Sequence, residues 1–330
     1  MAADASAVLR DILRPIQGLL ARDDLTDLCL NGPGAVYAET AAGWECLSTE
    51  GITETWLFTF ARALASFMNA TVSERQPLLS GHLPSGERVQ IVLPPAAEAP
   101  SITIRRPART TFSLTDLDAL GTFAPIAEGD VGAGHQRATL RRRLGGGPPG
   151  AVPDLLRAIV RHRLNVVIAG ATGSGKTTLS KAMIAEIPRA ERLIAIEDAR
   201  ELVFPQPNVV RLYYARDGAG VSPVSVRELL VACLRMKPDR ILLAELRDAE
   251  AYDYLRNVNS GHPGSITTVH ANSAAGAVEQ LMLMVRQSTA GAGLTRADIR
   301  GLVTSLVDVV IQMARRRVTE ILFLPDGAVC

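Results

Sequence analysis

GATGSGKTT, residues 170–178, is the stretch that decides the fold. It matches the pattern GxxxxGK[ST] in full, with Gly170, Gly175, Lys176 and Thr177 at the required positions. An apolar strand-like run, VVIA, precedes it, and a helical segment, TTLSKAMIAEI, follows it. The pattern is meaningful only between a strand and a helix. The sequence therefore predicts a phosphate-binding loop rather than a chance glycine turn in front of a helix.

The residues of this loop suit the phosphates of a nucleoside triphosphate. Small residues let successive backbone N–H groups turn inward around phosphate oxygens, and the helix N-terminus adds partial positive charge. Lys176 can reach the β- and γ-phosphates, and Thr177 offers a hydroxyl to Mg²⁺. We therefore predict ATP and Mg²⁺ as ligands, with the nucleotide held by the whole loop: Gly170, Ala171, Thr172, Gly173, Ser174, Gly175, Lys176, Thr177 and Thr178.

Outward from the loop, helical and short apolar strand-like segments alternate through residues 151–330. The strand-like segments include NVVIAG, LIAIED, RILLAE and SITTVH, and the last two, DVVIQMAR and TEILFLP, are spaced like a hairpin. Alternation of this kind predicts an α/β fold with a largely parallel sheet.

The first 107 residues have a different pattern. A helical segment over 7–22 is weakened by Pro15, a hairpin-like pair follows within 25–50, and a second helix is expected over 53–70. We predict a smaller α+β domain over 1–107, a loop-rich linker over 108–150, and a P-loop domain over 151–330.

Composition narrows the function. The chain has 330 residues and a net charge of +1, so no overall field favours nucleic acid. No aromatic residues lie among the arginines of 141–143 to stack on bases, and we predict no direct nucleic-acid binding. The four cysteines form no CxxC pair and no His lies at ligand spacing from them, which argues against zinc and favours a reducing compartment. Without a signal peptide or an apolar span, we expect a cytoplasmic protein.

Two strand-like segments end in acids. LIAIED ends at Glu197 and Asp198, and RILLAELRD delivers Glu245. In the second, Ala244 stands where the Mg²⁺-holding strand of a nucleotide hydrolase normally has Asp. A strand-end acid can simply cap a turn, but two of them in one P-loop domain favour a functional reading, since α/β sites form at the carboxyl ends of strands.

Two histidines flank the strand-like SITTVH. His270 ends it and can sense the γ-phosphate or orient an acid, whereas His262 lies in a turn between Gly261 and Pro263. As isolated residues, both would more often be structural.

In chain order, GATGSGKTT, IEDARELVF, LRMKPDRILLAELRDAEAYDYL and SGHPGSITTVHANS resemble the P-loop, Asp box, degenerate Mg²⁺ strand and His box of the traffic ATPases of type IV secretion systems, within the type II/IV secretion-system ATPase superfamily. LTDLCLNGPGAVYAETAAGWECL, PLLSGHLPSGERVQIVLPP and SITIRRP resemble the N-terminal domain of the type IV branch in particular. The resemblance covers roughly residues 7–325 and is weakest over 125–150.

The resemblance implies a homohexameric ring of subunits, each with a RecA-like C-terminal domain and with the nucleotide between its two domains. Arg88 and Arg105 match the family's arginines that reach the phosphates; strand-edge ion pairing is the alternative for both. Arg247 is a third candidate, or it holds Glu245 in place.

The resemblance also assigns catalytic roles. Glu245 polarises the attacking water, and Glu197, with its neighbour Asp198 and with Thr177, holds Mg²⁺. His270 links the γ-phosphate state to the rest of the domain, and hydrolysis shifts the N-terminal domain against the RecA-like domain.

The implied function is that of a motor that powers substrate transfer or pilus assembly in a type IV secretion or conjugation system. It would be peripheral to the inner membrane, with inner-membrane channel components and a coupling ATPase as partners. An ATPase of type II secretion or type IV pili is the alternative, although the paired CxxC insert of many such ATPases is absent. A RecA-like nucleic-acid motor and a non-hydrolysing switch are less favoured, the latter because Lys176, Thr177, Glu197 and Glu245 are all present.

Overall fold

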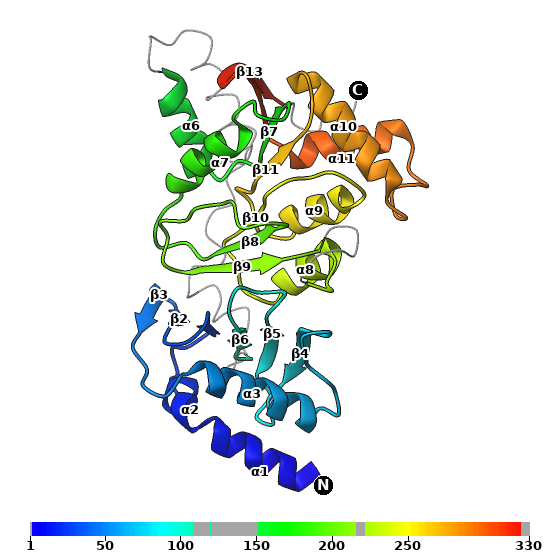
Figure 1. Ribbon diagram of the computed structural model, residues 1–330. Coiled ribbons are helices and arrows are strands. Elements are labelled where there is room, and N and C mark those ends of the chain that lie inside the picture. The colour runs from blue at the N-terminus through cyan, green and yellow to red at the C-terminus, as the bar shows by residue number, and fades with distance from the viewer. Residues whose placement is uncertain (1, 108–118, 120–150, 216–221, 325–330) are drawn as a thin grey trace.

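The computed structural model describes residues 2–107, 119, 151–215 and 222–324, and the predicted linker therefore lies outside the described residues apart from residue 119. Two sheets follow one another along the long dimension of the molecule (Figure 1). The N-terminal residues form the first sheet. The residues after 150 form a three-stranded and a four-stranded sheet that meet edge to edge at β10 and β11, and we describe the two together as the larger sheet.

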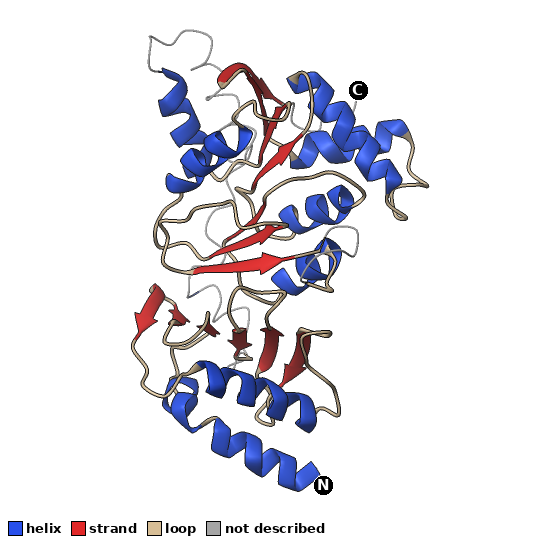
Figure 2. Ribbon diagram, in the orientation of Figure 1, coloured by secondary structure: helices blue, strands red, loops and turns tan. Residues whose placement is uncertain are grey.

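The N-terminal sheet is antiparallel throughout, with the strand order β3-β2-β1-β6-β5-β4. Helices cover one of its faces (Figure 2). The strands are β1 (Asp27–Leu30), β2 (Val36–Thr40), β3 (Gly43–Leu47), β4 (Leu78–His82), β5 (Arg88–Val92) and β6 (Ser101–Arg105), and the helices are α1 (Ala2–Ile12), α2 (Arg14–Leu20) and α3 (Glu54–Phe67).

Local sequence explains the helices of this layer. Pro15 lies in the first turn of α2, where a missing N–H costs nothing, so the predicted helix over 7–22 is interrupted before it. The hydroxyl of Thr53 accepts a hydrogen bond from the Trp56 N–H and caps α3. Leu57, Phe60 and Leu64 on α3 are fully buried against the sheet.

The larger sheet has the strand order β13-β12-β7-β11 continued by β10-β8-β9, and its strands are parallel except for β13. The predicted closing hairpin is β12–β13. The strands are β7 (Val166–Gly170), β8 (Leu193–Glu197), β9 (Val209–Tyr213), β10 (Arg240–Leu243), β11 (Ile266–Val269), β12 (Val309–Ala314) and β13 (Arg317–Phe323), and the helices are α6 (Ala151–Arg161), α7 (Lys176–Ala185), α8 (Val226–Cys233), α9 (Glu250–Val258), α10 (Ala274–Gln287) and α11 (Arg296–Leu306).

Helices cover both faces of the larger sheet (Figure 2). Successive side chains of its central strands therefore pack alternately against helices on one face and on the other. In β7, Val167 and Ala169 pack in a core shared with α8–α11, whereas Val166 and Ile168 pack in a second core shared with α6 and α7. A strand buried on both faces reads as a continuous apolar run, which is what the sequence shows. The predicted α/β fold, with a RecA-like P-loop part and a smaller α+β part, is confirmed.

A seam runs through the larger sheet between β10 and β11. Among the described residues, these neighbouring strands are joined by isolated bonds rather than by a ladder. The Leu246 N–H donates to the Thr268 carbonyl at 2.8 Å, the Thr268 hydroxyl to the Ala244 carbonyl at 3.0 Å, and the Ser265 hydroxyl to the Ile241 carbonyl at 2.5 Å. Glu245 follows β10 at the carboxyl end of this seam.

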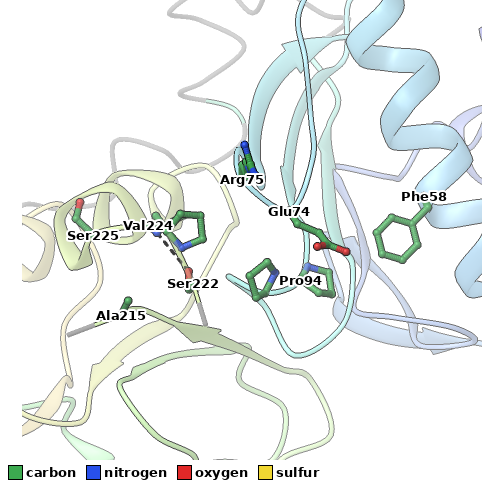
Figure 3. Close-up of a pocket in the computed structure, with 10 residues that line it drawn as sticks. Phe58, Glu74, Arg75, Pro94, Ala215, Ser222, Val224 and Ser225 are labelled. Carbon is green, nitrogen blue, oxygen red and sulfur yellow. Dashed lines mark hydrogen bonds between the residues drawn. The ribbon is translucent and has the colours of Figure 1, made fainter. Parts of the chain in front are cut away.

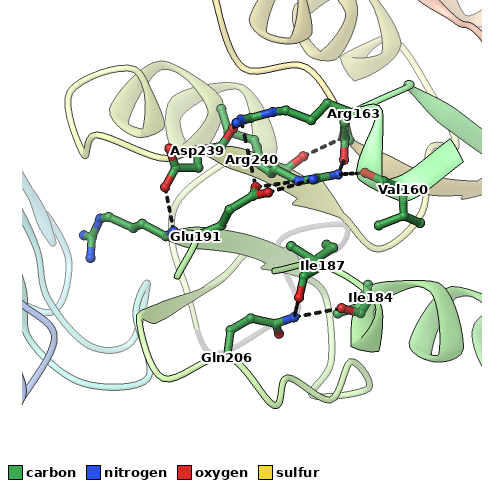
Figure 4. A network of polar contacts seen from close by, with 12 residues as sticks. Val160, Arg163, Ile184, Ile187, Glu191, Gln206, Asp239 and Arg240 are labelled. Atoms are coloured by element: carbon green, nitrogen blue, oxygen red, sulfur yellow. Dashed lines mark hydrogen bonds and ion pairs between the residues drawn. The ribbon is translucent and has the colours of Figure 1, made fainter. Parts of the chain in front are cut away.

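The amino ends of the strands are pinned by a buried polar network (Figure 4). The Arg240 guanidinium is fully buried and donates to both carboxylate oxygens of Glu191, at 2.6 and 2.8 Å. Its remaining nitrogen donates to the carbonyls of Val160 and Gly264 at 2.9 and 3.3 Å. Each of the three guanidinium nitrogens of Arg240 therefore has a hydrogen-bond partner.

The N-terminal sheet is fixed to the β9 edge of the larger sheet. Ala97 forms a bridge with Leu212, so the segment before β6 covers an edge that would otherwise expose unpaired backbone groups. The fully buried Arg192 donates from its guanidinium to Asn31 and Asn208, at 2.9 and 2.6 Å. This contact lies far along the sheet from β7.

None of the described helices combines the length and the hydrophobicity that crossing a bilayer requires.

Candidate nucleotide site

The loop 170–178 joins β7 to α7 at the carboxyl end of the sheet, as predicted. β12 runs parallel to β7, with Met313 opposite Gly170, so the tip of the β12–β13 hairpin lies against the loop. The Arg316 N–H donates to the Ser174 carbonyl at 3.0 Å and ties the two together. The hairpin is thus part of the loop's support.

Two glycines make this close approach possible. A Cβ at Gly170 would lie 2.5 Å from the Met313 carbonyl oxygen, a distance that real side chains do not reach. Gly175 has a φ of 99°, in the left-handed region, and a Cβ there would lie 3.2 Å from Met313 and 3.5 Å from the Cα of Arg316. The motif's glycines therefore serve packing as well as phosphate access.

A cavity of about 700 Å³ opens over the loop. Its walls combine the predicted loop residues with apolar side chains of α7 and of the β12–β13 hairpin, which the sequence analysis did not single out. The lining residues are Ala171, Gly173, Ser174, Gly175, Lys176, Thr177, Thr178, Leu179, Ala182, Met313, Arg316 and Val318. Gly170, which is buried, and Thr172, which is exposed, are not among the lining residues.

Lys176 is held over the loop. Its ammonium donates to the carbonyls of Gly170 and Ala171, at 2.8 and 3.1 Å, and its side chain is buried. Burial lowers the pKa of Lys176, and the charge of Glu245 acts in the opposite direction. The P-loop and the acid after β10 lie at the same edge of the sheet, because β7, β11 and β10 run side by side.

Glu245 lies at the centre of a charged cluster beyond the ends of β8, β10 and β11. One carboxylate oxygen accepts from the Arg247 guanidinium, and the other lies 2.7 Å from His270 Nε2. Arg247 also approaches Asp198 to 3.9 Å. The structure therefore brings together four of the residues that the sequence singled out.

Glu197 and Asp198 diverge, although they are adjacent. Glu197 is fully buried and accepts from the N–H groups of Glu201 and Leu202, at 2.9 and 2.7 Å, and from Arg211 at 3.2 Å. Burial raises the pKa of Glu197, and these partners offset part of the effect. Asp198, by contrast, lies beside Arg247 in the cluster around Glu245. Arg211 is a partner that the sequence analysis missed, because neither spacing nor a motif marks it.

The N-terminal arginines are not at the cavity of their own chain. Arg88 and Arg105 lie opposite each other on β5 and β6, and Arg105 is 3.3 Å from the buried Asp27. Neither side chain lines the P-loop cavity. His262 lies at the opposite end of the sheet, where it bonds the backbone of Pro238, and its burial lowers its pKa.

A second cavity of about 700 Å³ lies between the two sheets (Figure 3). Phe58, Glu74 and Pro94 line it from the N-terminal side, and Val224 and Ser225 line it from the start of α8. Its lining residues include no glycine-rich loop and no lysine, so the P-loop cavity is the one suited to a nucleotide.

Comparison with known proteins agrees with this geometry. The family described as "Type II/IV secretion system protein" matches residues 143–321. The type IV secretion system protein VirB11 of Bartonella henselae is 44% identical, with 97% of this chain and 94% of that protein covered. The type IV secretion system protein PtlH of Bordetella pertussis is 41% identical, with 97% and 96% covered.

A solved structure matches both sheets together. The crystal structure of the VirB11 ATPase from the Brucella suis type IV secretion system, in complex with sulphate, superposes with a TM-score of 0.89 at 38% identity. The match covers 98% of this chain and 96% of the other. With the P-loop, the acid cluster and these relatives in agreement, the chain belongs to the type II/IV secretion-system protein family, as one of its traffic ATPases.

Proposed function

We propose that this protein is the ATP-hydrolysing motor of a type IV secretion system and that it uses hydrolysis to drive substrate transfer or pilus assembly. The single observation that carries the proposal is the pairing of a complete P-loop with Glu245: the partner of Glu245, His270, follows β11, which runs beside the strand that opens the loop. A loop alone binds phosphate, whereas a loop beside a positioned carboxylate can also direct water at the γ-phosphate.

Glu245 is the residue that we assign to the water. Arg247 contacts one of its carboxylate oxygens and His270 contacts the other, so the two residues fix the orientation of the carboxylate. A carboxylate held in this way accepts a hydrogen bond from water without having to reorganise. His270 is half-exposed and contacts Glu245 directly, which supports a role in passing the state of the γ-phosphate to β11.

Mg²⁺ is the metal that fits the site. Thr177 presents a hydroxyl in the cavity, and Asp198 presents a carboxylate in the cluster beside it. Hard oxygen donors of this kind suit Mg²⁺, which would neutralise charge on the β- and γ-phosphates. We assign the acidic side of the metal site to Asp198, because the carboxylate of Glu197 is already occupied by Arg211 and by the backbone of 201 and 202. Glu197 then orders the loop after β8.

Arg88 and Arg105 complete the site in a ring of identical subunits, for which we propose six. Their own N-terminal sheet is fixed to β9, strands away from the P-loop. They would therefore serve the cavity of a neighbouring copy, where an always-charged planar donor suits phosphate. Residues 1–107 and 151–330 would act as the two domains of each subunit, joined by the linker 108–150.

In the cell, we place this motor at the cytoplasmic face of the inner membrane, docked on the channel components of its secretion system, with a coupling ATPase as a further partner. The relatives named above carry the assignment to a secretion system, because their printed names are those of type IV secretion proteins. We propose no direct contact with nucleic acid, since the chain is close to neutral overall.

The test is Lys176→Ala beside Lys181→Ala. Both lysines lie on α7, but only Lys176 lines the cavity. We expect Lys176→Ala to reduce Mg²⁺-dependent ATP hydrolysis to background, while Lys181→Ala retains it. Phosphate release measures the activity, and the thermal midpoint confirms that both variants fold. Normal hydrolysis by Lys176→Ala would refute the proposed site.

A further inference from the structure

The tip of the β12–β13 hairpin is built in a strained way. Arg315 and Arg316 form the two-residue turn, since Ala314 pairs with Arg317 on either side of it. Their φ angles are 48° and 62°, in the left-handed region. That region is unfavourable for an ordinary residue, and such turns normally carry Asn-Gly. Two arginines in these positions call for a functional explanation.

The two arginines are equal in charge and backbone but differ in position. Arg316 lines the P-loop cavity, and its N–H is bonded to Ser174, whereas Arg315 is not among the lining residues. In the part of the chain that the structure describes, no acidic group forms an ion pair with the Arg316 guanidinium. The Arg316 side chain is exposed at the mouth of the cavity and remains available to a ligand.

Strand order fixes which half of a nucleotide would face Arg316. β7 has β11 and β10 on one side, with His270 and Glu245, and β12 and β13 on the other. The γ-phosphate belongs on the side of Glu245, so the nucleoside extends toward the hairpin. There the cavity is lined by the apolar side chains of Leu179, Ala182, Met313 and Val318. An apolar slot of this kind suits a flat base rather than a phosphate.

We propose that the Arg316 guanidinium stacks on the base of the bound nucleotide and sets the affinity for the nucleoside half of the substrate. The inference rests on the proposed function, because it needs a nucleotide in the P-loop cavity. A guanidinium is planar and stacks on bases, as an ammonium cannot. The slot offers apolar side chains rather than a pattern of donors and acceptors, so purine bases are expected to be held with little discrimination.

The experiment compares Arg316→Asn with the matched control Arg315→Asn. Asn tolerates the left-handed conformation, so both variants keep the turn and lose one guanidinium each. We expect Arg316→Asn to raise the KM for ATP and for GTP roughly tenfold, with kcat within about twofold, since stacking energy is present in both ground and transition states. Arg315→Asn should leave both constants unchanged.

Two further measurements separate stacking from charge. Inorganic tripolyphosphate, used as a competitive inhibitor, carries the phosphates without a base, so its inhibition constant should be the same for Arg316→Asn and the wild type. Arg316→Lys should not restore the KM. An unchanged KM in Arg316→Asn, weakened tripolyphosphate inhibition, or full rescue by lysine would each overturn the proposal. Absence of hydrolysis in the wild type would instead refute the proposed function, so the two failures are distinguishable.

Discussion

The stretch from Arg240 to Asp248 begins and ends in opposite environments. At the amino end of β10, the Arg240 side chain is 0% exposed, and each of its three guanidinium nitrogens has a partner within the protein. At the carboxyl end, Glu245 is 13% exposed and its partner His270 is 48% exposed. Both ends hold ion pairs, but only the second can exchange a partner with a ligand. Charge that is enclosed by protein holds strands together, whereas charge that opens to solvent can perform chemistry.

The largest expected effect comes from breaking the enclosed end. Arg240→Met leaves the largely buried Glu191 with only the more distant Arg163, at 4.0 Å, and breaking a buried pair typically costs about 3–5 kcal/mol. The urea midpoint of unfolding measures the loss. Replacing both residues, Arg240→Met with Glu191→Met, should recover most of the stability, because the buried carboxylate is then absent and Arg163 keeps its bond to the Asp239 carbonyl. A single variant as stable as the wild type would contradict the role of this pair.

At Glu245, the carboxyl end of this stretch, a substitution should lower activity more than stability. Glu245→Gln keeps the shape of the side chain but removes the carboxylate that we assign to the water, so kcat should fall by about a hundredfold or more. The unfolding midpoint should fall by less than in Arg240→Met, since the partners left behind, Arg247 and His270, are 34% and 48% exposed and can be hydrated. Steady-state phosphate release gives the first quantity and urea unfolding the second. Glu186→Gln, on the exposed end of α7, is the control for loss of one carboxylate.

If Glu245→Gln kept its turnover, the contrast between a structural ion pair at Arg240 and a catalytic carboxylate at Glu245 would no longer hold. It would mean that the cluster around Glu245 is an ion-pair network like that of Arg240, and that another group directs the water.

A smaller effect is expected from pH. Asp27 lies near Lys237, just before β10, and it is buried between Arg105 and Glu39. Burial raises the pKa of Asp27 to about 6 from 3.8. The folded state therefore binds the proton more tightly than the unfolded state, and this carboxyl's contribution to stability is lost as the pH rises from about 4 through about 6.

Asp27→Asn removes that titration. Relative to the wild type, the variant should gain on the order of 2 kcal/mol in unfolding free energy between about pH 4 and about pH 7.5. Urea unfolding at both pH values tests it, with Asp24→Asn as the exposed control on the same segment. Parallel pH profiles of unfolding free energy for Asp27→Asn and the wild type would show that Asp27 does not titrate in this pH range.

Much of the fold and the centre of the site could be predicted from the sequence. The P-loop motif is local, because its glycines, Lys176 and Thr177 follow one another in the chain, and strand–helix alternation predicts a parallel sheet. Glu245 and His270 were predicted to lie near the loop because each follows an apolar strand, and the carboxyl ends of parallel strands meet at one edge.

What the sequence could not predict depends on register and on long-range packing. Glu197 and Asp198 are adjacent, and a shift of one residue moves a side chain to the opposite face of a strand, so spacing alone could not separate their environments. Arg316 belongs to a turn whose residues break the usual preference for Asn and Gly, so no turn signal points to it. The distance of Arg88 and Arg105 from the cavity depends on how two separately encoded sheets dock through Arg192.

The seam between β10 and β11 divides the molecule into two parts. The first part contains β8, β9 and β10, together with the N-terminal sheet, which is attached through Ala97 and Arg192. The second part contains the P-loop with β7, β11 and β12. Backbone pairing across this line is sparse, and one apolar core, which contains Val167 of β7 and Ile241 of β10, also joins the two sides. The contact between Glu245 and His270 crosses the same line. Glu245, the residue that we assign to the water, therefore also provides one of the contacts between the two parts.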